Sequence, residues 1–303
     1  MVEGISLAGM TETPIVIIDA QRPGPATGLP TRTEQADLLF TAHCAHGEFP
    51  RVILAPATAE EAFYMTGRAL HLAEKYQIPL FVLGDQFLND SSWTLEEFDL
   101  KRLDTEKTGI MSEEDLSSRD PYTYRRYENN VTGITPRILP GTGNQVLYAD
   151  SDEHTDEGHI TESAEVRVGM VEKRLSKLTA LRSDIEPPKV YPDMDRAEYV
   201  LSWGSTLGAV EEAVEMLRGD GVDIGYIHFS EIYPVKESLF TEEFIGNRIF
   251  ISVENNATGQ LARLLRMETG LKVSGTVSRF DGRPFTPGEL AKEILEKRGE
   301  ING

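Results

Sequence analysis

An arginine in a stiff loop is the strongest candidate for chemistry in this sequence. Arg22 lies in the stretch DAQRPGPATGLPTRTEQADL, residues 19–38, directly after a run of apolar residues. Prolines restrict the backbone of this loop, whereas Gly24 and Gly28 allow a close approach or a positive φ. A guanidinium held in one position is a bidentate partner for a carboxylate or a phosphate. We therefore predict that the loop binds an anion.

Other polar groups of the same loop could contact the same ligand. Hydroxyls lie nearby on Thr27, Thr31 and Thr33. The segment TRTEQADLLF predicts a helix, and the amides at the start of a helix favour an anion. Alternatively, Arg22 pairs with Asp19 or Glu34 and only braces the loop. The residues alone leave both interpretations open.

Alternating strands and helices must position this loop. Runs of apolar residues predict buried parallel strands at 13–19, 51–57 and 78–85. Between the last two, Thr58 and Glu61 form a capping box that begins a predicted helix. Ligands of open parallel sheets bind beyond the carboxyl ends of the strands, and the loop after the first strand must lie there.

The alternation of predicted strands and helices stops after the first third of the chain and resumes in the last third. Residues 96–190 are polar with little apolar periodicity, apart from an exposed charged helix that we predict at 164–178. Strands and helices alternate again over 191–303, beginning with a predicted strand at 197–204. Ser205 or Thr206 is expected to cap the helix that follows, whose predicted apolar face consists of Leu207, Val210, Ala213, Val214 and Leu217. We therefore expect an α/β unit at 1–95, an extended connecting segment at 96–190 and a second α/β unit at 191–303.

Four further motifs favour structural over chemical interpretations. SDEHTDEGH has a metal-like composition around His154 and His159, but a solvated turn is favoured. Cys44 lies in AHCAHGE, where a buried thiol inside a small-residue helix is favoured over a nucleophile. WGSTLG, at the start of a helix, is a weak signal for a phosphate or coenzyme A site. In VENNATGQ the asparagines are expected to cap a helix.

Composition excludes several classes of function. The formal net charge is -20, from 30 basic and 50 acidic residues, so a nucleic acid is an unfavourable partner. A single cysteine provides no Cys-based metal or iron–sulfur site and favours a reducing cytoplasm. No apolar run approaches the ~18 residues of a membrane span, so we expect no membrane association.

Several stretches together resemble the α subunit of 2-oxoacid:ferredoxin oxidoreductases, the type that acts on 2-oxoglutarate and related acids. The likeness is strongest in EGISLAGMTETPIVIIDAQRPGPATGLPTRTEQADLL and continues in GITPRILPGTGN, SDEHTDEGHITESAEVRVGMVEKRLSKL and VENNATGQLARLLR. The resemblance implies part of a pyrimidine-type thiamine-diphosphate-binding domain with a parallel sheet. A transketolase C-terminal-like α/β domain is expected to follow it.

The resemblance also implies a reaction and its participants. Such an enzyme oxidatively decarboxylates a 2-oxoacid to acyl-CoA and CO2 and reduces ferredoxin. Arg22 would bind the substrate carboxylate, with Thr27, Gly28 and Thr31 in the same substrate site. Thiamine diphosphate and Mg would be shared with a β subunit, which would hold the [4Fe–4S] cluster in an α2β2 assembly. Ferredoxin is expected to dock on the β subunit, because this chain is acidic like ferredoxin itself.

The sequence departs from this family in one respect. A YPITP-like segment and a glutamate that activates the aminopyrimidine ring precede, in relatives, the position where this sequence begins. We therefore expect residues outside this sequence to complete the thiamine site. A rival expectation is a non-catalytic structural or regulatory subunit built on the same scaffold.

Overall fold

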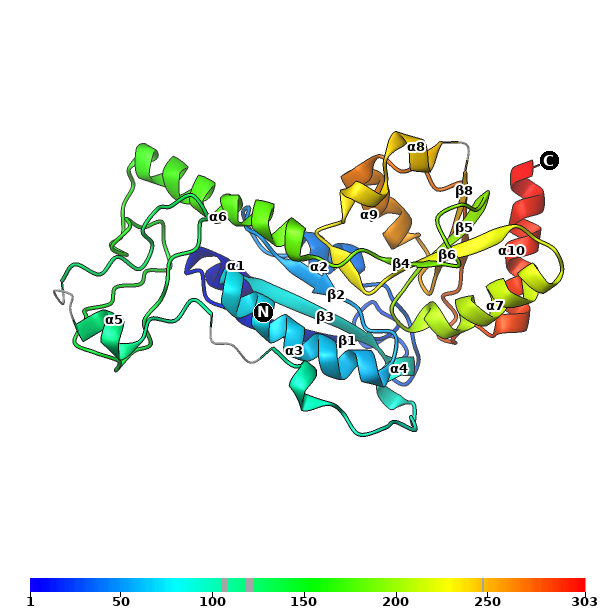
Figure 1. Ribbon diagram of the computed structural model, residues 1–303, viewed down its shortest axis with the longest axis horizontal. Helices are drawn as coiled ribbons and strands as arrows, with labels where there is room; N and C mark the ends of the chain where they lie inside the picture. The colour runs from blue at the N-terminus through cyan, green and yellow to red at the C-terminus, as the bar shows by residue number, and fades with distance from the viewer. Residues whose placement is uncertain (105–107, 118–121, 247, 303) are drawn as a thin grey trace.

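The computed structural model describes residues 1–104, 108–117, 122–246 and 248–302, which form two β-sheets (Figure 1). The strands are β1 (Ile15–Gln21), β2 (Val52–Leu54), β3 (Pro79–Asp85), β4 (Lys189–Tyr191), β5 (Glu198–Trp203), β6 (Ile224–Phe229), β7 (Glu231–Tyr233), β8 (Ile249–Glu254) and β9 (Gly275–Ser278). The helices are α1 (Val2–Met10), α2 (Leu38–His43), α3 (Ala59–Tyr76), α4 (Gln86–Asp90), α5 (Glu113–Ser117), α6 (Ala164–Asp184), α7 (Leu207–Gly219), α8 (Glu242–Ile245), α9 (Gln260–Thr269) and α10 (Pro287–Asn302). None of these helices is long and apolar enough to cross a membrane.

The first sheet has the strand order β1-β3-β2-β7, with β1, β3 and β2 parallel. All seven residues of β3 are buried, because β3 lies between two strands and packs against α3. β1 is parallel, as predicted, but it lies at the edge of the sheet and the side chain of Ile18 is 67% exposed. The expectation of a buried strand was therefore wrong for β1, since position in a sheet is not encoded in a local apolar run.

The second sheet has the order β4-β6-β5-β8-β9, in which β6, β5, β8 and β9 are parallel. The predicted apolar face of α7 is confirmed: its five members are buried against this sheet, at Leu207, Val210, Ala213, Val214 and Leu217. The cap of α3 is also confirmed, because the hydroxyl of Thr58 accepts a hydrogen bond from the amide of Glu61 at 3.1 Å. The expected class, two largely parallel α/β units, is confirmed.

One strand crosses from the second unit to the first. β7 follows β6 directly but pairs antiparallel with β2, so it completes the edge of the first sheet. The amide of Ala55 also donates to the carbonyl of Ser230 at 2.7 Å. Side chains of both sheets, including Phe81 and Trp203, belong to one apolar cluster. The two sheets therefore share a continuous core.

The helix predicted at 164–178 is α6, which runs from the connecting segment toward the first sheet (Figure 1). The expectation that it is exposed was wrong for one face of the helix. Lys173 and Lys177 are buried, and both bind the carboxylate of Glu12, at 2.7 and 2.6 Å. These two lysines are buried because the buried carboxylate of Glu12 compensates their charge.

Two smaller expectations also change. His154 does not lie in a solvated turn: it is fully buried against the ring of Tyr127, with 3.9 Å between ring centroids. Cys44 is buried as expected, but it follows α2 rather than lying inside a helix. Burial raises the pKa of its thiol, which agrees with a structural role.

Candidate functional site

Arg22 comes directly after the carboxyl end of β1, and its side chain is exposed. Within the described part of the chain it forms no ion pair and no side-chain hydrogen bond, with Asp19 and Glu34 or with any other residue. The alternative in which Arg22 only braces the loop is therefore wrong in this structure. Its guanidinium is available to an anionic ligand.

A tight turn follows Arg22 and depends on glycine. The amide of Leu29 donates to the carbonyl of Pro23 at 3.0 Å. Gly28 has a φ of +49°, and a Cβ at this position would lie 1.6 Å from the same carbonyl oxygen. No other residue type fits there without moving the chain. The turn therefore folds Gly28 back against Pro23, next to Arg22.

The other predicted site residues are distributed along this exposed loop. Thr27 and Thr31 are exposed, and neither hydroxyl bonds to another described residue. Thr33 differs, because its side chain is buried and donates to Asp85. The loop thus brings Thr27 and Gly28 into the turn beside Arg22, whereas no contact ties Thr31 to it.

The helix expected within TRTEQADLLF begins only at Leu38 and has six residues. The preceding residues run along the second unit instead: the amide of Thr33 donates to the carbonyl of Gly282 at 3.2 Å, and that of Gln35 to the carbonyl of Asn255 at 2.7 Å. These two amides already donate to carbonyls of the second unit, so they are not available to an anion. The predicted helix N-terminus at the loop was therefore wrong.

Asp85, the last residue of β3, joins the loop to the second unit, and sequence reasoning did not single it out. Its side chain is 2% exposed and accepts hydrogen bonds from the hydroxyl of Thr33 at 3.2 Å and the amide group of Gln35 at 3.5 Å. It also accepts from the hydroxyl of Ser205 and, at 3.0 Å, from the amide of Leu88. Burial raises the pKa of this carboxyl, although the four donors oppose the shift.

Ser205 and Thr206 do not cap α7 as predicted. A 3-10 turn, Gly204–Thr206, precedes the helix, and neither side chain bonds to the helix amides. The hydroxyl of Thr206 donates to the carbonyl of Trp203 at 2.7 Å, while that of Ser205 donates to Asp85. A contact between the units has replaced the local cap.

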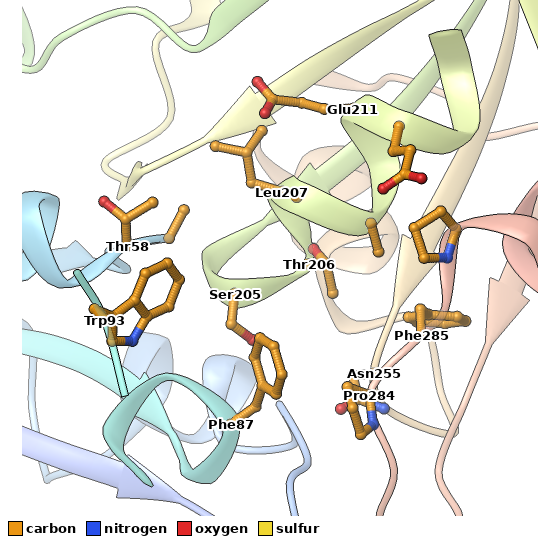
Figure 2. A pocket seen from close by; sticks show the side chains of 15 residues that line it. Thr58, Phe87, Trp93, Ser205, Thr206, Leu207, Glu211, Asn255, Pro284 and Phe285 are labelled. Atoms are coloured by element: carbon orange, nitrogen blue, oxygen red, sulfur yellow. The ribbon is translucent and has the colours of Figure 1, made fainter. Parts of the chain in front are cut away.

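A pocket of about 370 Å³ lies between the two units, beside this contact (Figure 2). Its first-unit walls include Phe87 and Trp93, and WGSTLG lines the opposite side through Ser205, Thr206 and Leu207. Glu211 and Glu212 also line the pocket. Lys189 compensates the charge of Glu211 at 2.6 Å, whereas the negative charge of Glu212 opposes a phosphate. The pocket therefore does not favour the phosphate interpretation of WGSTLG, and Arg22 is not among its lining residues.

The described residues hold no cluster of possible metal ligands. Among them, no group of three His, Cys, Asp or Glu side chains is arranged to hold a metal ion. In VENNATGQ, Asn256 accepts from the amides of Gly259 and Gln260 at the start of α9, as expected for a cap. Asn255 instead donates to the carbonyl of Arg279 at 2.7 Å and so joins two loops.

The chain is similar to proteins of one family along its whole length. The family described as pyruvate flavodoxin/ferredoxin oxidoreductase, thiamine diphosphate-binding, matches residues 1–173. The chain is 36% identical over 314 residues to subunit alpha of 2-oxoacid:ferredoxin oxidoreductase 1 of Sulfurisphaera tokodaii, with 100% of this chain and 48% of that protein covered. It is 28% identical to the 2-oxoglutarate synthase subunit KorA of Methanothermobacter marburgensis, with 97% and 76% covered. The chain thus spans about half the length of the first of these relatives.

A solved structure agrees with these similarities. The 2-oxoglutarate:ferredoxin oxidoreductase from Magnetococcus marinus, with 2-oxoglutarate, coenzyme A and succinyl-CoA bound, superimposes with a TM-score of 0.89 at 30% identity. The alignment covers 98% of this chain and 51% of that one. Because the family match spans more than half of the chain, the protein belongs to the pyruvate flavodoxin/ferredoxin oxidoreductase family and contains its thiamine-diphosphate-binding domain.

Proposed function

We propose that this chain is a catalytic α subunit, or part of one, of a 2-oxoacid:ferredoxin oxidoreductase. The enzyme would convert a 2-oxoacid and coenzyme A to acyl-CoA and CO2 and would reduce ferredoxin, with 2-oxoglutarate as the favoured substrate. The single observation that carries the proposal is Arg22, an exposed guanidinium without an ion pair in the described chain, at the carboxyl end of a parallel strand. Relatives named for 2-oxoglutarate support the substrate.

Arg22 would bind the carboxylate of the 2-oxoacid. Thiamine diphosphate, when bound, supplies the nucleophilic carbon for the keto group. The planar guanidinium can donate two parallel hydrogen bonds to a carboxylate, which fixes the rotation of the acid as well as its position. Thr27 can donate a further hydrogen bond from the same turn, and Gly28 keeps the turn closed. Such orientation contributes about 100-fold in rate, which corresponds to roughly 3 kcal/mol.

Other participants belong to the same proposal. A β subunit would hold the Mg and the [4Fe–4S] cluster and would receive ferredoxin, in an α2β2 assembly in the cytoplasm. The single cysteine and the net charge of -20 support this division, because a cluster needs several thiolates and two acidic proteins repel each other. We retain 1–95, 96–190 and 191–303 as the proposed division of the chain.

Replacing Arg22 tests the proposal directly. In the complete enzyme with its partner subunit, Arg22→Ala should lower kcat/KM for the 2-oxoacid by about 100-fold or more, because the bidentate contact is lost. Steady-state kinetics of 2-oxoglutarate-dependent electron-acceptor reduction measure this effect.

Arg32→Ala is the matched control, since Arg32 is an exposed arginine of the same loop that forms no ion pair with described residues. It should change kcat/KM by less than about threefold, because a charge without direct contact acts only through a screened field. Equal losses in both variants would mean that only the general positive charge matters. Unchanged kinetics in Arg22→Ala would instead favour the non-catalytic subunit.

A further inference from the structure

We propose that Asp85 is a positioning residue for Arg22. It acts by connecting residues 22–36, the Arg22 loop, to the second α/β unit through a hydrogen bond with Ser205. This inference rests on the proposed function of Arg22. It adds that substrate binding depends on a buried contact between the units. Asp85 itself does not touch the substrate.

The two ends of the loop are first held together beside β3. The side chain of Gln21 donates to the carbonyl of Gly84 at 3.1 Å and accepts from the amide of Asp37 at 3.0 Å. Gln21 is 1% exposed, so water does not compete for these bonds. Residues 22–36 therefore leave and rejoin the fold at one point, next to Asp85.

Asp85 then fixes the returning half of the loop. Its carboxylate accepts from Thr33 and Gln35 of the loop, and both of these side chains are at most 1% exposed. The hydroxyl of Thr33 also accepts from the amide of Phe87 at 3.2 Å, and the side chain of Gln35 donates to the carbonyl of Trp203 at 3.0 Å. The returning half is thus bound to both units.

Ser205 of the second unit is the partner of Asp85 across the boundary between the units. Its hydroxyl is directed to Asp85 rather than to the start of α7, and Figure 2 shows it beside Phe87 at the boundary of the units. The side chain of Gln35 lies close against Gly204, because a Cβ there would be 2.8 Å from the side-chain nitrogen of Gln35. One buried carboxylate therefore joins β3, the loop and the second unit.

Arg22 depends on these anchors because its own side chain has none. Its guanidinium forms no ion pair and no hydrogen bond with described residues. Its position is therefore set by the backbone, which β1 fixes before it and the Asp85 contacts fix after it. Pro23, Pro25 and Pro30 lie between these anchors and fix the backbone φ at their positions, so the loop has little freedom to move Arg22.

A double-mutant cycle in the complete enzyme separates this role from a purely structural one. The variants are Ser205→Ala, Arg22→Ala and their combination, with Asp85→Asn as a second way to weaken the contact. Ser205→Ala and Asp85→Asn should each raise KM for the 2-oxoacid by about tenfold or more, with a smaller effect on kcat and none on KM for coenzyme A. In the Arg22→Ala background, Ser205→Ala should change kcat/KM by less than about twofold.

Ser183→Ala is the matched control, because its exposed hydroxyl bonds only within α6. It should leave all kinetic constants unchanged. Equal effects of Ser205→Ala in the two backgrounds would overturn the inference, since the contact would then act independently of Arg22. If Arg22→Ala alone leaves kcat/KM unchanged, the proposed function fails, and this result is visible before the cycle is completed. If Asp85→Asn does not fold, the Ser205→Ala cycle still decides.

Discussion

At the scale of single residues, Glu12 is the carboxylate on which two buried lysines depend. Lys173 and Lys177 are at most 1% exposed, and both ammonium groups bind Glu12. Burial by itself would raise the pKa of Glu12, but the two lysines lower it to about 2. Glu12 therefore stabilises the fold only while it is ionised.

Glu12→Gln should destabilise the protein by about 3 kcal/mol or more at neutral pH, because it leaves two buried ammonium groups without a counter-charge. The wild-type contribution should be fully present above about pH 4.5 and should disappear as the pH falls toward 2, since the folded-state pKa is the lower one. Urea unfolding from pH 7 to pH 3 measures both effects.

Glu3→Gln is the control for this prediction, because Glu3 is an exposed carboxylate of the neighbouring helix α1. Its stability should follow the wild type at each pH. The assignment of the acid-sensitive contribution to Glu12 would be wrong if Glu12→Gln and the wild type lost the same stability between pH 4.5 and 3.

At the scale of elements, the Arg22 loop is a closed turn whose shape depends on Gly28. Its positive φ and the contact with the carbonyl of Pro23 both exclude a side chain. Residues 24–32 of the loop are exposed, so this part of the loop buries little apolar surface. A change at Gly28 should therefore affect the position of Arg22 more than the stability of the whole protein.

Gly28→Ala should lower kcat/KM for the 2-oxoacid by at least about tenfold, while the free energy of unfolding falls by only about 1–2 kcal/mol. Kinetics and chemical unfolding of the same preparation give the two numbers. Gly47→Ala is the matched control, because Gly47 also has a positive φ, +81°, but a Cβ there would meet nothing within 4 Å. Equal losses of kcat/KM in the two variants would show that the closed turn is not required.

At the scale of the whole molecule, β7 makes the two α/β units depend on each other. Glu231, the first residue of β7, binds the guanidinium of Arg68 on α3 and accepts from the amide of Glu186 at 2.9 Å. Its side chain is 5% exposed. One carboxylate thus connects the second unit with the helix that covers the first sheet and with the end of the connecting segment.

Glu231→Gln should destabilise this junction by about 3 kcal/mol, because Arg68 loses a partly buried counter-charge. Hydrogen exchange should become faster in β2 and β7 together, since the two strands pair with each other. Glu237→Gln, which removes an exposed partner of Arg182, is the control and should leave both strands unchanged. Faster exchange in β7 alone would argue against the shared core.

The sequence by itself determined several regular elements of this protein. Apolar runs located β3 and β5, and helical periodicity located the buried face of α7. The Thr58 cap was also predictable, because a capping box acts within four residues. The positive φ of Gly28 was predictable too, because a glycine in a tight turn acts through local geometry. The function assigned to Arg22 stays a prediction until its replacement is measured.

Only the tertiary structure decided which polar groups meet. Asp85 binds Ser205 across 120 positions of the chain, and Glu12 binds Lys173 across 161. Neither pairing leaves a periodic signal in the sequence, so Ser205 was assigned to a local cap and α6 to the solvent. Buried carboxylates must find donors, and this requirement outweighs weak local preferences for capping or exposure. The contact that holds the Arg22 loop is therefore a property of the folded chain.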